Sequence, residues 1–102
     1  TGRLINRRPA YELDMEAVMQ AAKGRGTLLE LNANPARLDL NDVHLAAAKR
    51  LGIPSAINSD AHSIDGLDVM RYGVMQARRG GLARENVANC LTWNQFKKRF
   101  LK

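Results

Sequence analysis

The sequence predicts an α/β domain in which two or three parallel strands are flanked by helices. Apolar runs at 27–32 and 53–57 have the length of strands, and a helical pattern at 41–51 lies between them. The order strand, helix, strand with short connections is a βαβ unit, which makes the two strands parallel neighbours in one sheet.

The residues before the first strand predict a loop and a helix. Residues 1–10 contain a glycine, three arginines and a proline and have no periodic pattern, which is typical of a loop. Asp14 is suited to cap the helix that follows, and Gly24 and Gly26 are suited to end it. Its apolar face is expected to carry Met15, Val18, Met19 and Ala22.

The helix between the strands begins after a loop at 33–40. Asn41 is a good N-cap, and Gly52 closes the helix before the second strand. Its apolar face is expected to carry Val43, Ala46, Ala47 and Leu51.

Helical patterns fill most of the remaining chain. A helix is expected over about 66–79, partly periodic in Val69, Tyr72, Val74 and Met75, and Gly80-Gly81 stops it. A short helix near 84–89 follows. Thr92 can cap a last helix in which Trp93, Phe96 and Phe100 share one face. That aromatic stripe predicts packing against the sheet rather than a platform for stacking nucleic-acid bases.

Composition limits the class of protein. The 102 residues suit one small domain, and 45% hydrophobic with 25% charged residues is ordinary for a soluble globular protein. A formal net charge of +6 favours anionic partners, including nucleic acid, without indicating a fold. Cys90 is the only cysteine, so an internal disulfide is excluded and a reducing, cytoplasmic location is expected. There is no signal-peptide pattern and no apolar stretch near the roughly 20 residues of a membrane helix.

Both predicted strands end in polar groups, which lie within residues 30–34 and 58–63. Functional groups of parallel α/β folds collect at these carboxyl ends of strands. Asp60 and His62 lie two residues apart and can point at one ion. A carboxylate with an imidazole suits Mn²⁺, Zn²⁺ or Fe²⁺. The alternative is a loop aspartate that caps the next helix beside a surface histidine, and spacing alone favours neither.

Other polar residues have ordinary structural explanations. His44 is expected to be a partly exposed helix residue, and Asp39 and Asp42 to serve the loop and the helix N-terminus. Glu30 is equally compatible with a functional role and with an ion pair to Arg37.

The N-terminal loop carries Arg3, Arg7 and Arg8. These side chains either hold a phosphate through paired N–H donors or form a solvated basic surface. Ser59 and Ser63 flank the Asp60–His62 pair, but no second base is placed to activate them.

Several segments in a fixed order resemble a known family. They are Thr1-Gly2-Arg3, Leu29 to Pro35, Arg37 to Asp42, Ile57 to Ser63, Met70 to Gly73 and Ala77 to Gly80. Together they resemble the C-terminal part of the polymerase-and-histidinol-phosphatase (PHP) domain of bacterial family X DNA polymerases, over essentially all of residues 1–102.

The resemblance implies a distorted β/α barrel that holds up to three metal ions, of which this chain would be one part. It implies a Mn²⁺-dependent 3′-5′ exonuclease and phosphoesterase that acts with a polymerase core in DNA repair, with Zn²⁺, Fe²⁺ or Mg²⁺ as other possible ions. Asp60 and His62 match the family's last two metal ligands, and Arg3 is expected to steady the phosphate. The family's other ligands precede the Thr1-Gly2-Arg3 segment, so the chain is expected to be a piece of a longer enzyme.

Two consequences follow from that expectation. Two ligands do not hold a multinuclear cluster, so the 102-residue chain is expected to be inactive or nearly so. Open strand edges and an uncovered apolar face predict self-association, or partner segments that complete the sheet.

Two other functions stay open. The chain could be a non-catalytic DNA-binding or scaffold module of the same fold, with its +6 charge facing phosphates. It could also be a histidinol-phosphate-type phosphatase of small molecules, although the segments 32–35 and 37–39 resemble the polymerase-associated branch.

Overall fold

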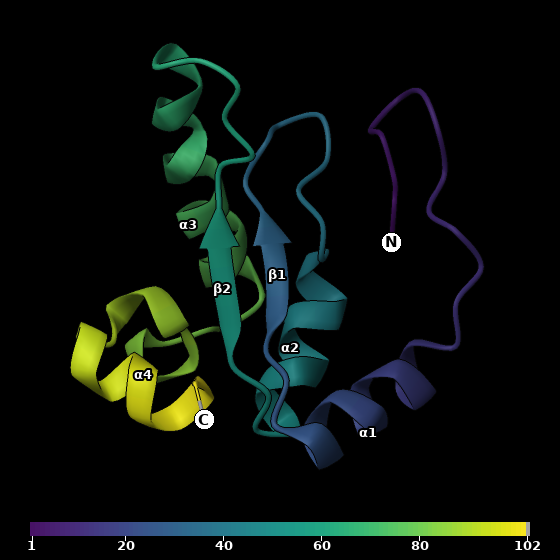
Figure 1. The fold of residues 1–102 in the computed structure, drawn as a ribbon. Helices are drawn as coiled ribbons and strands as arrows, with labels where there is room; N and C mark the ends of the chain where they lie inside the picture. Colours follow the sequence, from purple (N-terminus) through teal and green to yellow (C-terminus); the bar gives the residue numbers. More distant parts are fainter. Residues whose placement is uncertain (102) are drawn as a thin grey trace.

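The computed structural model describes residues 1–101, and its elements follow the predicted order around a central pair of strands (Figure 1). The elements are α1 (Met15–Arg25), β1 (Leu29–Asn32), α2 (Asp42–Arg50), β2 (Ser55–Asn58), the 3-10 turn η1 (Asp65–Val69), α3 (Met70–Arg79), the 3-10 turns η2 (Arg84–Asn86) and η3 (Ala88–Cys90), and α4 (Trp93–Phe100).

The two strands are parallel, as the βαβ order predicts. Leu29 lies opposite Ser55 and Asn32 lies opposite Asn58, so both strands end at the same level. The predicted caps are also present. Asp14 accepts a hydrogen bond from the Ala17 N–H at the start of α1. At α2 and α4 the caps are Asn41 and Thr92.

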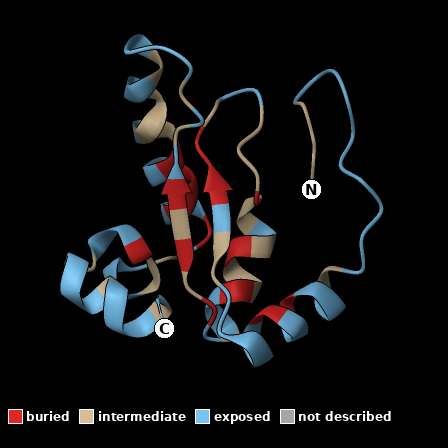
Figure 2. Cartoon of the chain, in the orientation of Figure 1, coloured by how far each residue is buried: buried red, intermediate tan, exposed pale blue. Residues whose placement is uncertain are grey.

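The core lies between the sheet and helices α2 and α3. Leu31 and Ile57 project from the two strands onto Leu45 of α2 and Ala77 of α3. A second cluster joins α1 and α2 below the sheet through Met19, Ala22, Ala48 and Ile53. Figure 2 shows this burial concentrated on the strands and on the inner sides of the helices.

Some predicted apolar faces are wrong. Val43 is 68% exposed, and α2 instead buries Leu45 and Ala48. Val18, Val74 and Met75 are exposed as well. Periodicity finds the helices, but small residues such as Ala48 and Ala77 share the buried faces with Leu45 and Met19, so apolar size alone does not mark the buried face.

Helix α3 packs very closely against the sheet behind the carboxyl ends of the strands. Gly73 of α3 is buried there, and a Cβ placed on it would lie 2.5 Å from Ile57 Cγ2 and 2.7 Å from Ala33 Cβ. Only a glycine allows α3 to approach the sheet this closely.

Both outer edges of the sheet are partly closed, which corrects the expectation of open edges. The Asn89 side chain accepts from the Ile57 N–H at 2.8 Å and donates to the Ile57 carbonyl at 2.9 Å, as a neighbouring strand would. Val87 forms a parallel bridge with Ser55 on the same edge. On the other edge, Asn32 N–H donates to Asp39 O at 2.6 Å.

The aromatic stripe of α4 is less buried than predicted. Trp93 is 64% exposed, while Phe96 and Phe100 are half-buried. The rings pack on one another, with centroids 6.2 Å apart for Trp93 and Phe96 and 5.0 Å apart for Phe96 and Phe100. Helix α4 lies beside the sheet (Figure 1), and Trp93 and Phe96 line a hollow together with Leu28 and Ala56 of the sheet face. Within residues 1–101 no helix has the length and apolar character needed to span a membrane.

Candidate metal site

The carboxyl ends of the two strands bring the polar residues of both loops together. Asn32, at the end of β1, is 9% exposed and donates from Nδ2 to Asp60 Oδ2 at 3.2 Å. Its Oδ1 accepts from the Asn34 N–H at 2.9 Å, which begins the turn of the 33–40 loop. Asn32 therefore ties the loop after β1 to the carboxylate after β2, a role that the sequence pattern did not identify.

Asp60 holds its place through an unusual backbone conformation. Its φ is +54°, in the left-handed region that aspartate tolerates better than most residues. Ser59 Oγ accepts from the Ala61 N–H at 3.3 Å and supports this turn. The turn aims the Asp60 carbonyl oxygen back at the His62 ring, with Nδ1 at 2.7 Å.

This contact decides how a neutral His62 ring is protonated. A carbonyl oxygen only accepts hydrogen bonds, so Nδ1 carries the proton and donates it. The lone pair then lies on Nε2, the atom through which a neutral imidazole binds a metal. Metal-bound histidines commonly donate their other ring N–H to a carbonyl or carboxylate in this way.

The donor set fits a divalent cation in kind but supplies only part of a coordination shell. The Asp60 carboxylate and His62 Nε2 are oxygen and nitrogen donors suited to Mn²⁺, Zn²⁺ or Fe²⁺. Both residues are exposed. Within residues 1–101 no group of three His, Cys, Asp or Glu side chains is close enough to share an ion. Asp60 and His62 are therefore the two candidate ligands that the described residues place together for an ion.

A polar hollow of about 280 Å³ lies at the end of β1 and is lined in part by Asn32, the hydrogen-bond partner of Asp60. Its lining includes Glu30, Asn32, Arg37 and Asp39. Glu30 accepts from Asn58 Nδ2 at 3.1 Å rather than pairing with Arg37, which corrects one of the two sequence interpretations of Glu30. Arg37 thus brings positive charge to a hollow that shares Asn32 with the Asp60 site.

Arg3 is anchored to the loop that surrounds this hollow. Its Nε donates to Arg37 O at 2.7 Å, and its Nη2 donates to Leu38 O. Asp39 secures the same segment by accepting from the Thr1 ammonium at 2.5 Å and from the Gly2 N–H at 3.0 Å. Burial alone would raise the pKa of the Asp39 carboxyl. The hydrogen bonds to Asp39 and the charge of the terminal ammonium lower this pKa by more, so it lies below its ordinary value.

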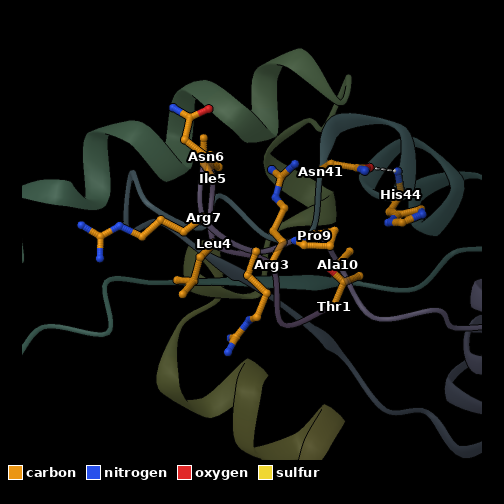
Figure 3. A pocket seen from close by; sticks show the side chains of 11 residues that line it. Thr1, Arg3, Leu4, Ile5, Asn6, Arg7, Pro9, Ala10, Asn41 and His44 are labelled. Atoms are coloured by element: carbon orange, nitrogen blue, oxygen red, sulfur yellow. Dashed lines mark hydrogen bonds between the residues drawn. The ribbon is translucent and has the colours of Figure 1, made fainter.

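The arginines of the N-terminal loop do not converge on one point. A hollow of about 560 Å³ lies inside this loop, and in Figure 3 Arg3 and Arg7 point in different directions from it. Arg8 donates to the Gly2 carbonyl at 3.0 Å. His44, a half-buried residue of α2 as predicted, lines the same hollow. The structure thus separates the three arginines that the sequence had grouped.

The fold and this pair of side chains define an α/β unit with a carboxylate and an imidazole at the carboxyl end of a parallel strand. The chain is 51% identical over 89 residues to "DNA polymerase/3'-5' exonuclease PolX" of Bacillus subtilis (strain 168). The match covers 87% of this chain and 16% of that relative, so the chain spans about a sixth of the relative's length. No protein-family model matches the chain.

Proposed function

We propose that the chain is part of a metal-dependent phosphoesterase, a 3′-5′ exonuclease unit joined to a DNA repair polymerase. The observation that carries this proposal is the 51% identity to a protein named as a DNA polymerase and 3′-5′ exonuclease. The likeness covers most of this chain but a small share of the relative, so the activity belongs to a longer protein. DNA would be its partner.

We also propose that residues 1–102 are the C-terminal part of a PHP-type β/α barrel. Strand residues that point away from the core alternate with the buried ones. Leu28 precedes β1 on this face, Glu30 lies opposite Ala56, and Asn32 lies opposite Asn58, so the face becomes more polar toward the carboxyl ends of the strands. This arrangement is that of a β/α barrel whose interior is filled by apolar side chains near the amino ends of the strands and is polar at their carboxyl ends. Without further strands, the face with Leu28 and Ala56 would favour self-association of the isolated chain.

Asp60 and His62 would be two ligands of a divalent ion, with Mn²⁺ first and Zn²⁺, Fe²⁺ or Mg²⁺ as alternatives. When bound, such an ion supplies Lewis-acid polarisation of a phosphoryl oxygen and activation of water. Asn32 would hold the Asp60 carboxylate in position through its 3.2 Å hydrogen bond. The Asp60 carbonyl would keep His62 in the tautomer that leaves Nε2 free. With only two ligands, the 102-residue chain would catalyse little by itself.

Two arginines would serve the phosphate in different ways. Arg3 uses two of its five N–H donors on loop carbonyls, and the other donors can face a phosphate. Arg37 lines the hollow that contains Asn32, the hydrogen-bond partner of Asp60. Arg37 would therefore contact the phosphate, while Arg3 would mainly shape the loop that presents it.

A chimera tests this function. Residues 1–102 would replace the matching segment of the B. subtilis relative, and release of nucleotides from a 3′-labelled DNA strand would be measured with Mn²⁺. We expect the chimera to be an exonuclease and Asp60→Asn to reduce its rate at least 100-fold, a loss typical of a removed metal ligand or its support. A matched Asp68→Asn change on the exposed η1 turn should leave the rate within about twofold.

Two results would reject parts of this proposal. Full exonuclease activity in the Asp60→Asn chimera would remove Asp60 from the metal site. Strong Mn²⁺-dependent nuclease activity of the 102-residue chain alone, abolished by Asp60→Ala, would show that other ligands are not needed. The same likeness to a polymerase and exonuclease favours this function over a small-molecule phosphatase.

A further inference from the structure

Many of the basic residues of this chain lie in the last turns of its α-helices. The last turns of the four α-helices carry Lys23 and Arg25, Lys49 and Arg50, Arg78 and Arg79, and Lys97, Lys98 and Arg99. A cation at a helix C-terminus interacts favourably with the helix dipole, which accounts for each group by itself. The helix dipole does not explain why the ends of separate helices would line the same hollow.

Two of these helix ends do share a hollow at the amino ends of the strands. Arg25 ends α1 just before β1, and Arg99 lies in the last turn of α4. The C-terminus of α4 lies near the lower end of the two strands in Figure 1, away from the strand ends that carry Asp60. Two adjoining hollows of about 140 and 430 Å³ open there and share Gly26, Thr27, Arg99 and Phe100. We call this surface the basal groove.

The basal groove is cationic and has an aromatic wall. Lys23, Arg25 and Arg99 line it, all three are exposed, and no carboxylate is among its lining residues. Within residues 1–101 none of these three cations forms an ion pair. The Arg99 guanidinium lies over the Phe100 ring, 5.2 Å from its centroid. Positive charge here is left without a partner inside the described part of the chain.

We propose that the basal groove binds the phosphodiester backbone of a nucleic-acid strand. Three cations around one groove raise the local concentration of polyanions and gain affinity by releasing condensed counterions. Guanidinium groups can bind phosphate oxygens in pairs, and the Phe100 ring supports the Arg99 guanidinium at the wall of the groove. This site is separate from Asp60 and His62 and does not depend on the proposed exonuclease activity.

Binding of a fluorescent single-stranded oligonucleotide to the 102-residue chain, measured by anisotropy against salt concentration, tests the proposal. The groove variant carries Lys23→Gln, Arg25→Gln and Arg99→Gln. The control variant carries Arg7→Gln, Arg78→Gln and Arg84→Gln, which removes as many charges from exposed positions outside the groove. Circular dichroism of both variants checks that they fold.

We expect the groove variant to bind at least tenfold more weakly near 0.1 M salt and the control to change less than about threefold. The slope of log K against log salt should fall by roughly 2 in the groove variant, at about 0.7 for each lost contact with a single strand. Equal weakening of both variants would overturn the proposal, because net charge alone would then explain binding. Binding of anionic lipid vesicles but not of the oligonucleotide would also overturn it. An Asp60→Asn chain should bind the oligonucleotide normally, which keeps this test independent of the metal site.

Discussion

Replacing Gly73 by alanine should destabilise the fold, although alanine is the better helix former. The added Cβ would lie 2.5 Å from Ile57 Cγ2 and 2.7 Å from Ala33 Cβ, both inside ordinary contact distance. Overpacking of this kind costs about 1–3 kcal/mol. Removing a glycine from a helix interior returns roughly 0.5–1 kcal/mol. The net loss in the free energy of unfolding should therefore be about 1 kcal/mol, because Ile57 belongs to β2 and Ala33, directly after β1, is held by its N–H bond to Asn58 O at 2.8 Å.

Gly24→Ala is the matched control. Gly24 lies in α1, and a Cβ there would meet nothing within 4 Å, so only the helix-propensity gain of roughly 0.5–1 kcal/mol remains. Urea denaturation followed by circular dichroism should place the two variants about 2 kcal/mol apart, on opposite sides of the unaltered chain. A Gly73→Ala chain as stable as the Gly24→Ala chain would refute the close approach of α3 to the sheet.

Other predictions concern the sheet edge, pH and association. Asn89→Ala removes both hydrogen bonds to the Ile57 backbone and should cost about 1–3 kcal/mol in urea denaturation, and a loss under 0.5 kcal/mol would contradict the edge contact. Because the folded pKa of Asp39 is lowered, its carboxylate stabilises the fold above about pH 3.9, and this contribution disappears as the pH falls through the folded value. The stability difference between the 102-residue chain and its Asp39→Asn variant should shrink in acid, whereas a constant difference would contradict the assignment. Sedimentation should detect self-association of the isolated chain, and a strictly monomeric, cooperatively folding species would count against an uncovered sheet face.

The elements of this fold could be predicted because their signals are local. Asp14, Asn41 and Thr92 cap helices through hydrogen bonds to residues three positions on, and such contacts can be recognised in the sequence. The parallel pairing followed from the strand, helix, strand order. The buried helix faces were harder, because Gly73 and Ala77 make the close contacts while larger apolar residues such as Val43 are exposed.

The candidate site could be predicted only in outline. The spacing of Asp60 and His62 suggested a shared ion, but it could not reveal the positive φ of Asp60 that turns its carbonyl toward the imidazole. The hydrogen bond from Asn32 joins residues 28 positions apart and depends on the register of the strands. The basal groove brings α1 and α4 together, and no local pattern connects Arg25 with Arg99.

Paramagnetic Mn²⁺ can show whether Asp60 and His62 bind a divalent metal ion. Mn²⁺ would be titrated into the isotopically labelled 102-residue chain while its NMR signals are recorded. We expect the signals of residues 59–63 and of the Asn32 side chain to broaden first, and this selective broadening to disappear in an Asp60→Asn, His62→Ala variant. Broadening that begins at other carboxylates such as Asp42, or that is unchanged in the variant, would contradict this proposal.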